Sequence, residues 1–304
     1  MDRILKQTGD PKMIEKLLAL PRADLNSLLL ALFDKQSMRL SPQGILKAYS
    51  QNRFSVPGEL DPAAFHALEA ELLRTAQNTG MQTVLLSPCA PLGSCSVFGC
   101  VNQYNVISSL RGVETLSDPS NMLAIIIADK LKNRACDNTT PLHYATSARV
   151  VRAQPVEGEG FFAHFGVYCM VSSGKDRGAY MCEKELLEKH LLFYRETLQT
   201  KFGAKLSIVL CKRSGYKDGD GFFEQISEAI QAILPGTPLA FANDDLDNRY
   251  YQGINFKIMM HTKGGAVEIG DGGFVNWMSQ MLGSKKERCL ISGIGLDRLV
   301  LCGE

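Results

Sequence analysis

The 304-residue sequence predicts an α+β fold, in which a mostly antiparallel sheet is interleaved with helices and preceded by a helical extension. Three observations lead to this prediction. Apolar residues recur at helical spacing through residues 1–60. Short apolar segments follow, and turns rather than regular crossover helices separate many of them. Apolar residues make up 45% of the chain and charged residues 21%, which is typical of a globular protein with a full core and excludes disorder.

The first 60 residues are expected to form a small helical packing or interaction module. Leu25, Leu28, Leu29 and Leu32 recur every three or four positions, as on one face of a helix. Prolines at positions 21 and 42 interrupt the pattern and divide the segment into short helices. We therefore predict two domains, an N-terminal extension over residues 1–60 and a core over 61–304.

Within the core, aspartate–proline pairs indicate where helices begin. Asp61-Pro62 starts a helix that Gly80 ends, because aspartate caps a helix N-terminus and proline fits the first turn. Asp118-Pro119 repeats this pattern before a helix over 119–132. Residues 89–105 are rich in Cys, Gly, Ser and Pro and are expected to form a loop. Further helices are predicted at 183–201, 222–233, 275–282 and 296–301, and strands at 81–86, 148–153, 161–172, 206–211, 250–260, 266–269 and 290–292.

Charge and patterning also exclude some classes of protein. Lysine and arginine total 33 and aspartate and glutamate 32, so the basic excess typical of nucleic-acid-binding proteins is missing. No apolar run approaches the roughly 20 residues that cross a bilayer, and the N-terminus lacks a secretory signal. Nine scattered cysteines, an odd count, are interpreted as reduced thiols. These features predict a cytoplasmic protein without a membrane span.

The C-terminus carries a pattern that suits a polyphosphate. Gly293 and Gly295 stand between a predicted strand and a predicted helix, and Arg298 lies one turn into that helix. Glycines let a ligand approach the backbone, a helix N-terminus attracts anions, and arginine is a bidentate donor. An ordinary tight turn has the same pattern, so both interpretations stay open.

Residues 62–304 resemble the catalytic core of class II aminoacyl-tRNA synthetases, and the histidyl branch most. The glycines and Arg298 resemble motif 3, in which an arginine binds the γ-phosphate of ATP. Five further segments resemble that branch in the correct order. They are residues 80–88 (motif 1), 149–154 and 162–167 (the two strands of motif 2), 250–256 and 272–276.

The resemblance implies binding of ATP with Mg²⁺ and formation of an acyl-adenylate. Arg152 would bind the α-phosphate and the carboxylate that is activated, Phe162 would stack on adenine, and Arg298 would bind the γ-phosphate beside Gly293 and Gly295. Two other interpretations stay open. Arg152 is also consistent with a strand arginine paired to Glu157, and Phe162 with a core aromatic residue.

The same resemblance implies a pocket for a small amino or carboxylic acid. Asp118 would receive an amino group, and His164 lies on the returning strand of motif 2. Tyr250 and Tyr251 occupy adjacent strand positions, so we expect them to point to opposite faces, with one in the core and one in the pocket. The remaining pocket residues implied are Gly272 and Gly273.

Several departures from the family pattern argue against ordinary tRNA aminoacylation. Gln154 replaces the acid of motif 2, and the loop at 155–160 is acidic. Phe274, Val275 and Asn276 replace the Arg, Tyr and Asp of the family, so selection of histidine is not expected. The chain ends six residues after Arg298, where the family continues into an anticodon-binding domain. tRNA is therefore not expected as a partner.

The sequence thus predicts a synthetase-like homodimer, formed through motif 1, that binds ATP and a small acid. It leaves open whether the protein is an adenylate-forming ligase. The other possibility is a non-catalytic regulatory paralogue that docks a partner enzyme, similar to the regulatory subunit of ATP phosphoribosyltransferase. A metal at Cys89, Cys95 and Cys100 is a third hypothesis, although no Cys-x-x-Cys pair occurs and buried thiols explain these residues equally well.

Overall fold

The computed structural model describes residues 1–133, 140–155 and 162–303. Its helices are α1 (Asp2–Thr8), α2 (Met13–Leu18), α3 (Arg22–Ser37), α4 (Pro42–Gln51), α5 (Pro62–Asn78), α6 (Pro119–Lys132), α7 (Met181–Phe202), α8 (Gly219–Ile233), α9 (Trp277–Leu282), α10 (Leu296–Gly303) and the 3-10 turn η1 (Gln103–Asn105). Its strands are β1 (Gln82–Thr83), β2 (Cys89–Pro91), β3 (Val113–Thr115), β4 (Leu142–Val151), β5 (His164–Lys175), β6 (Lys205–Lys212), β7 (Leu239–Phe241), β8 (Gln252–Thr262), β9 (Gly265–Phe274) and β10 (Glu287–Gly295).

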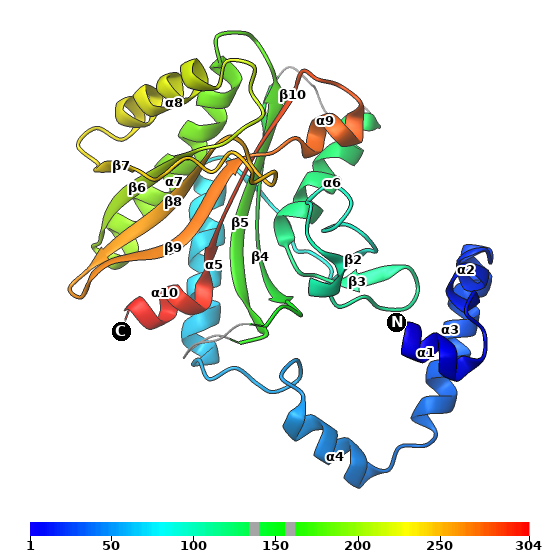
Figure 1. Ribbon diagram of the computed structural model, residues 1–304. Coiled ribbons are helices and arrows are strands. Elements are labelled where there is room, and N and C mark those ends of the chain that lie inside the picture. Colours follow the sequence, from blue (N-terminus) through cyan, green and yellow to red (C-terminus); the bar gives the residue numbers. More distant parts are fainter. Residues whose placement is uncertain (134–139, 156–161, 304) are drawn as a thin grey trace.

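Eight strands form one sheet in the order β1-β4-β5-β10-β9-β8-β6-β7, and helices flank it (Figure 1). The pairs from β4 through β6 are antiparallel, which confirms the predicted α+β architecture. The two outermost pairs, β1–β4 and β6–β7, are parallel. Strand β1 is shorter than the predicted 81–86. After Thr83 one more ladder bond forms, from Val84 N–H to the Ala145 carbonyl, and Pro88 has no N–H to donate.

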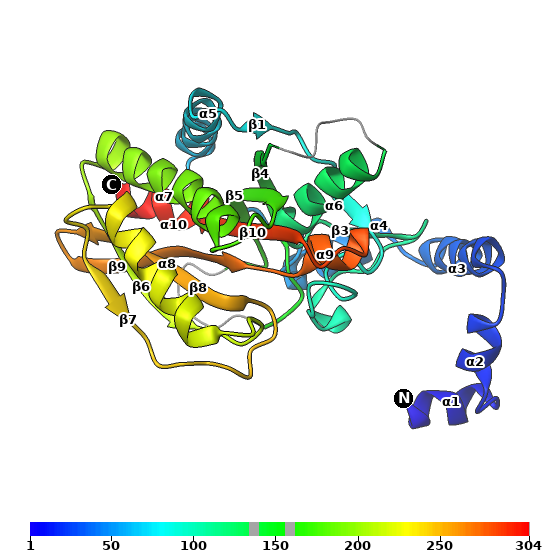
Figure 2. The same cartoon turned by 90° about the horizontal axis from the view of Figure 1, so that it is seen from above.

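Alternating side chains send the core to both faces of the sheet. On β5, Tyr168 and Met170 pack with α5, α7, α8 and α10. The intervening Cys169 and Val171 pack with α6 and α9 on the other face. This alternation is the period-2 geometry of a strand buried on both sides, and Figure 2 shows helices above and beside the sheet. The central strands are therefore held from two sides, which fixes the side chains at their ends.

The predicted aspartate caps are present. Asp61 accepts hydrogen bonds from the N–H groups of Ala63 and Ala64 at the start of α5. Asp118 accepts from the N–H of Ser120 at the start of α6. Each cap satisfies an amide that has no partner inside the helix, which is worth about 1 kcal/mol. The second cap places the Asp118 carboxylate at the N-terminus of α6, on the side of the sheet where α6 packs.

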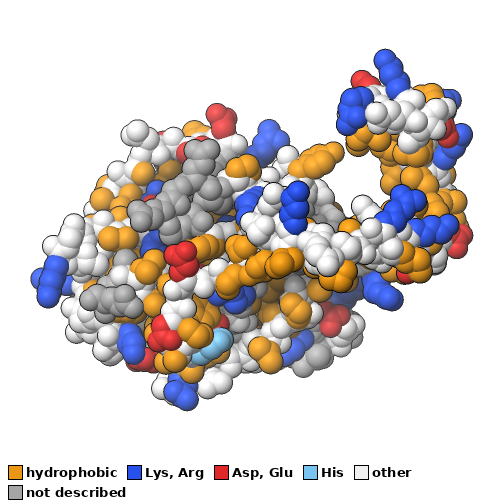
Figure 3. Space-filling view, turned by 90° about the horizontal axis from the view of Figure 1, so that it is seen from below, with side chains coloured by type: hydrophobic (Ala, Val, Ile, Leu, Met, Phe, Trp, Pro, Cys, Tyr) orange, Lys and Arg blue, Asp and Glu red, His pale blue; other side chains and the backbone are white. Residues whose placement is uncertain are grey.

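Helices α1–α4, residues 1–51, form an arm that projects from the rest of the molecule (Figures 1 and 2). None of these helices has a buried residue, and apolar side chains lie exposed along the arm (Figure 3). Asn26 of α3 accepts a hydrogen bond from Arg111 N–H, and Arg53 after α4 donates to the Ala153 carbonyl. No helix in the described parts of the chain is long and apolar enough to cross a membrane.

A candidate ligand site between the sheet and helix α6

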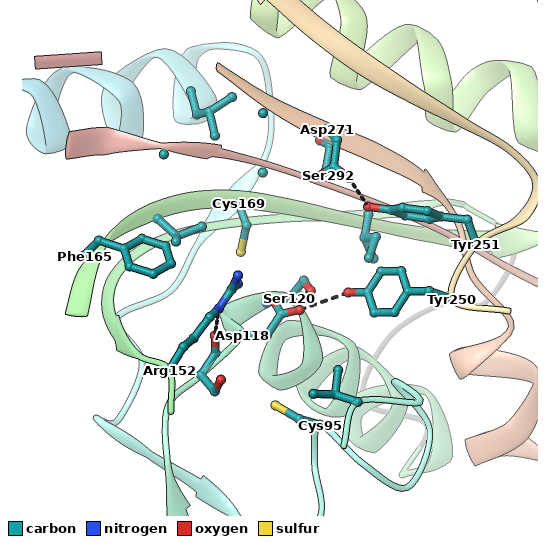
Figure 4. A pocket seen from close by; sticks show the side chains of 18 of the residues that line it. Cys95, Asp118, Ser120, Arg152, Phe165, Cys169, Tyr250, Tyr251, Asp271 and Ser292 are labelled. Carbon is teal, nitrogen blue, oxygen red and sulfur yellow. Dashed lines mark hydrogen bonds between the residues drawn. The ribbon is translucent and has the colours of Figure 1, made fainter. Parts of the chain in front are cut away.

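A cavity of about 400 Å³ lies between the sheet and the N-terminus of α6 (Figure 4). Strands β5, β9 and β10 form its floor, and the segment before β8 closes one side. Among the described lining residues, the charged ones are Asp118, Arg152 and Asp271. Apolar side chains such as Val101, Val167 and Ile291 line the rest. A mostly apolar hollow with a few convergent charges is typical of a small-molecule site.

Two tyrosine–aspartate pairs are the central feature of this cavity. The Tyr250 hydroxyl donates to Asp118 Oδ2 at 3.0 Å, and the Tyr251 hydroxyl donates to Asp271 Oδ2 at 3.0 Å. Both rings extend into the cavity in Figure 4, with their centroids 4.8 Å apart. The expectation that the tyrosines face opposite sides is therefore wrong. They precede β8, which begins at Gln252, so the alternation of a strand does not apply to them.

Burial in the cavity shifts the pKa values of Asp271, Tyr250 and Tyr251. Burial raises the pKa of Asp271, and the hydrogen bond from Tyr251 opposes that shift. Burial also raises the pKa of Tyr250 and of Tyr251 well above the usual range, and the neighbouring carboxylates raise both further. Both phenols therefore remain protonated donors at neutral pH. The tyrosine hydroxyls orient the carboxylates of Asp118 and Asp271, so a cation in the cavity would find two oriented acceptors.

Arg152 is the one positive charge among the described lining residues. It follows the end of β4, and its Nε donates to the Ser117 carbonyl at 3.1 Å. Its guanidinium carbon lies 5.1 Å from the centroid of the Phe165 ring, a cation–π distance. These two contacts hold the guanidinium at the cavity (Figure 4). Glu157, the other partner considered for Arg152, lies outside the described residues.

The structure brings Gly293 and Gly295 to the same cavity as Arg152. They end strand β10 instead of forming the expected turn after it. Arg298 lies in the first turn of α10 and is not among the residues that line the cavity. Its Nη1 donates to the Glu268 carbonyl at 2.6 Å. Arg152 and Arg298 were both expected to bind phosphates of one ATP molecule, but only Arg152 lines the cavity.

Phe162 and His164 are placed away from the cavity lining. Phe162 is half-buried, and Phe165, three residues later, lines the cavity in its place. His164 Nδ1 contacts the Arg149 guanidinium at 2.6 Å, and its Nε2 donates to the Val56 carbonyl at 2.6 Å. His164 therefore ties the start of β5 to the segment that follows the arm.

Gly272 and Gly273 support the cavity without lining it. A Cβ on Gly272 would lie 2.5 Å from the Ser292 side chain on β10, and one on Gly273 would lie 2.5 Å from the Tyr251 ring. Both distances are far below van der Waals contact, so a side chain at either position would displace its neighbour. Because Gly273 has no side chain, the Tyr251 ring can occupy the position in which its hydroxyl donates to Asp271.

Of the three loop cysteines, only Cys95 lines the cavity. Cys89 is half-buried in β2 and Cys100 is exposed. Burial raises the pKa of Cys95 to about 12, with a further rise from the charge of Asp118, so the thiol is protonated at neutral pH. In the described part of the chain, no three His, Cys, Asp or Glu residues are grouped to hold a metal ion. The loop cysteines and the described cavity residues are therefore not grouped to hold a resident metal by themselves.

Sequence reasoning missed Asp271, Phe165 and Cys169, which also line the cavity. The sequence shows only that Asp271 is an acidic residue two positions after the predicted strand 266–269, among glycines, and not that it lies in a buried strand. A charged residue in a buried strand requires a partner or a ligand. Phe165 and Cys169 gave no signal either, because apolar residues in a core strand are ordinary.

A scan against models of protein families finds no match, and neither does a search of curated proteins. Solved structures do match. An ATP phosphoribosyltransferase regulatory subunit/histidyl-tRNA synthetase from Bacillus halodurans is 12% identical, with a TM-score of 0.62 over 83% of each chain. Apo histidyl-tRNA synthetase from S. aureus is 12% identical, with a TM-score of 0.59 over 81% of this chain and 69% of that one.

A threonyl-tRNA synthetase from Aeropyrum pernix is also similar, at 12% identity and a TM-score of 0.62 over 79% of this chain and 59% of its own. At such identities the similarity shows the fold alone. The chain has the fold of the class II synthetase core, as its sequence motifs predicted, and the histidyl-type structures are among those it matches.

Proposed function

We propose that this chain is a synthetase-like paralogue that binds a small amino acid in the cavity. The observation that supports it is the placement of one guanidinium and two carboxylates around one cavity of about 400 Å³. The α-carboxylate of the ligand would pair with Arg152, and the α-ammonium would pair with Asp118, whose Oδ2 is oriented by Tyr250. Ion pairs with hydrogen bonds are strong where water is excluded.

A second candidate function is ATP-dependent activation of that amino acid. Gly293 and Gly295 line the same cavity, and Phe165 offers an aromatic face beside Arg152. In this reaction a carboxylate oxygen attacks the α-phosphorus, the bond to the β-phosphate oxygen breaks, and pyrophosphate leaves. Arg152 would stabilise the charge on the α-phosphate. Against it, Arg152 is the only cationic side chain among the described lining residues.

The non-catalytic alternative is favoured by Gln154, which lines the cavity where motif 2 has an acid. In that case the bound amino acid would act as a signal to a partner enzyme. We also propose a cytoplasmic homodimer that does not bind tRNA. In support, β1 is an edge strand, and Leu85 just after it is 95% exposed, while the net charge is only +1.

Calorimetric titration of the full chain with amino acids, with and without ATP and Mg²⁺, tests the proposal. We expect Arg152→Gln to weaken the binding of a responding amino acid by about tenfold to a hundredfold, because hydrogen bonds between charged groups contribute about 1.5–3 kcal/mol. Arg149→Gln is the matched control, since Arg149 lies on β4, three residues before Arg152, but contacts His164 outside the cavity. The Arg149→Gln variant should bind the amino acid with the affinity of the wild-type chain.

The same samples decide between the two functions. Pyrophosphate exchange that depends on an amino acid would show adenylate formation, whereas binding without exchange would favour the regulatory function. If no amino or carboxylic acid binds to the wild-type chain, the proposed function is wrong.

A further inference from the structure

The cavity has an unequal charge balance that the binding of a simple amino acid does not correct. Its described lining carries two carboxylates, Asp118 and Asp271, and one guanidinium, Arg152. A zwitterionic ligand adds one positive and one negative charge, so one carboxylate still lacks a counter-charge. Tyr250 and Tyr251 supply hydrogen bonds to these carboxylates but no charge.

Resting on the proposed function, we propose that the ligand is a diamino acid, with its α-carboxylate on Arg152, its α-ammonium on Asp118 and a side-chain ammonium on Asp271. The ligand then neutralises every charge among the described lining residues. A neutral amino acid would leave Asp271 without a counter-charge in a partly buried site, which is costly. An acidic amino acid would add a third negative charge.

The two carboxylates come from different walls, which suits a ligand with two separated cations. Asp118 caps α6, while Asp271 lies on β9. Tyr250 and Tyr251 extend to them separately (Figure 4). The apolar residues Val167 and Ile291 line the same cavity and can contact the methylene groups that join the two ammonium groups.

Hydrogen-bonding capacity separates the roles of the two carboxylates. An ionised carboxylate accepts about four hydrogen bonds. Asp118 already accepts from Ser120 N–H at 2.9 Å, from Ser120 Oγ at 2.6 Å and from Tyr250 at 3.0 Å. Asp271 accepts from Tyr251 at 3.0 Å. Asp271 therefore has more room for an ammonium group, which has three donors. Burial raises the pKa of its carboxyl, and the nearby carboxylates of Glu268 and Asp118 raise it further.

Calorimetry of the wild-type chain with a matched ligand series tests this inference. L-Lysine, L-ornithine and 2,4-diaminobutyrate are compared with L-norleucine, which has nearly the shape of lysine without its second charge. We expect the best diamino acid to bind at least about tenfold tighter than norleucine, equivalent to about 1.4 kcal/mol. 1,5-Diaminopentane, which lacks the carboxylate, should bind more weakly than lysine because it cannot pair with Arg152.

Two variants then assign the second charge to its residue. Asp271→Asn should remove most of the preference for the diamino acid and change norleucine affinity by less than about threefold. Glu268→Gln is the control, because Glu268 lies on the same strand and contacts Lys257 instead of the cavity. It should keep the preference.

The outcomes separate this inference from the proposed function. If norleucine or another neutral amino acid binds as tightly as the diamino acids, the inference is wrong and the proposed function stands. A diamino preference that survives in Asp271→Asn overturns the assignment to Asp271. If no amino acid binds, both fail. Because the ligand series uses the wild-type chain, the test does not depend on a variant that folds.

Discussion

Helices α5 and α3 are close in length, with 17 and 16 residues, and both have leucines at helical spacing. In α5, four residues (Phe65, Leu68, Leu72 and Ala76) are buried against the sheet and its other helices. In α3 no residue is buried, and Leu32 is 56% exposed. Similar sequence patterns thus lead to one helix with a buried apolar face and one with no buried residue.

The difference shows what apolar periodicity does and does not determine. Helices as short as these gain most of their stability from tertiary packing rather than from propensity. In α5, burial supplies that packing. The arm has hydrogen bonds within its helices, such as the Ser41 cap on Gly44 N–H, and few contacts with the sheet. The comparison predicts that equivalent changes have large effects in the body, defined as residues 61–303, and small effects in the arm.

The largest expected difference is between two leucine-to-alanine substitutions. Leu72→Ala removes a side chain that is 1% exposed and should lower the free energy of unfolding by about 2–5 kcal/mol. Leu32→Ala on α3 should change it by no more than about 0.5 kcal/mol. Urea titration followed by tryptophan fluorescence measures both, because the single tryptophan, Trp277, is buried in the body. Equal losses would show that the arm packs as tightly as the core.

Acid should destabilise the body through His143, which is half-buried, and His190, which is fully buried. Burial lowers the pKa of His143 to about 4 and the pKa of His190 well below its usual range. His143 contacts Ser172 Oγ at 2.7 Å, which in turn contacts His190 at 2.8 Å. Below about pH 6.5 the unfolded chain binds protons that the folded chain does not, so stability falls as the pH decreases. For His143 this loss ends near pH 4.

Each histidine can contribute a slope of up to about 1.4 kcal/mol per pH unit in that range. Urea titrations at several pH values between 7 and 4.5 measure the slope for the wild type and for His143→Gln, which should be less steep. The arm contains no histidine, so removing the arm should leave the slope unchanged. If His143→Gln leaves the slope as it is, His143 does not remain neutral in the folded chain.

The sequence predicted more of the sheet and its helices than of the cavity. Local chemistry predicted the capped helices α5 and α6, because Asp-Pro at a helix start acts within four residues. The resemblance to the class II synthetase core also implied that Arg152, Asp118 and both tyrosines belong to one site, and all four line the cavity. Asp271 was missed because its role depends on a partner twenty residues away, Tyr251, and on burial that comes only from the folded sheet.

The exposure of the arm was likewise beyond the reach of sequence. Periodicity shows that Leu28 and Leu32 share a helix face, but not whether anything covers that face. The division of the chain at residue 60 also stays a prediction. It follows from composition and turns, and an experiment on the arm itself is needed to test it.

Removing residues 1–51 is the change for which we expect the smallest effect, and the one that tests the comparison most directly. The truncated chain retains Arg53 and Val56, which contact Ala153 and His164. If the arm acts independently, the melting temperature at low protein concentration should change by less than about 2 °C, since a loss of 1 kcal/mol shifts it by about 2–4 °C in a protein of this size.

The same truncation can contradict the comparison if it is measured at several protein concentrations. Exposed apolar residues on α3 and α4 gain stability only if a second chain covers them, and such stability depends on concentration. A melting temperature that rises with concentration in the full chain but not in the truncated one would mean that the arm packs against another copy. Helices α5 and α3 would then both be packed, and they would differ only in what they pack against: α5 against its own chain and α3 against a second copy.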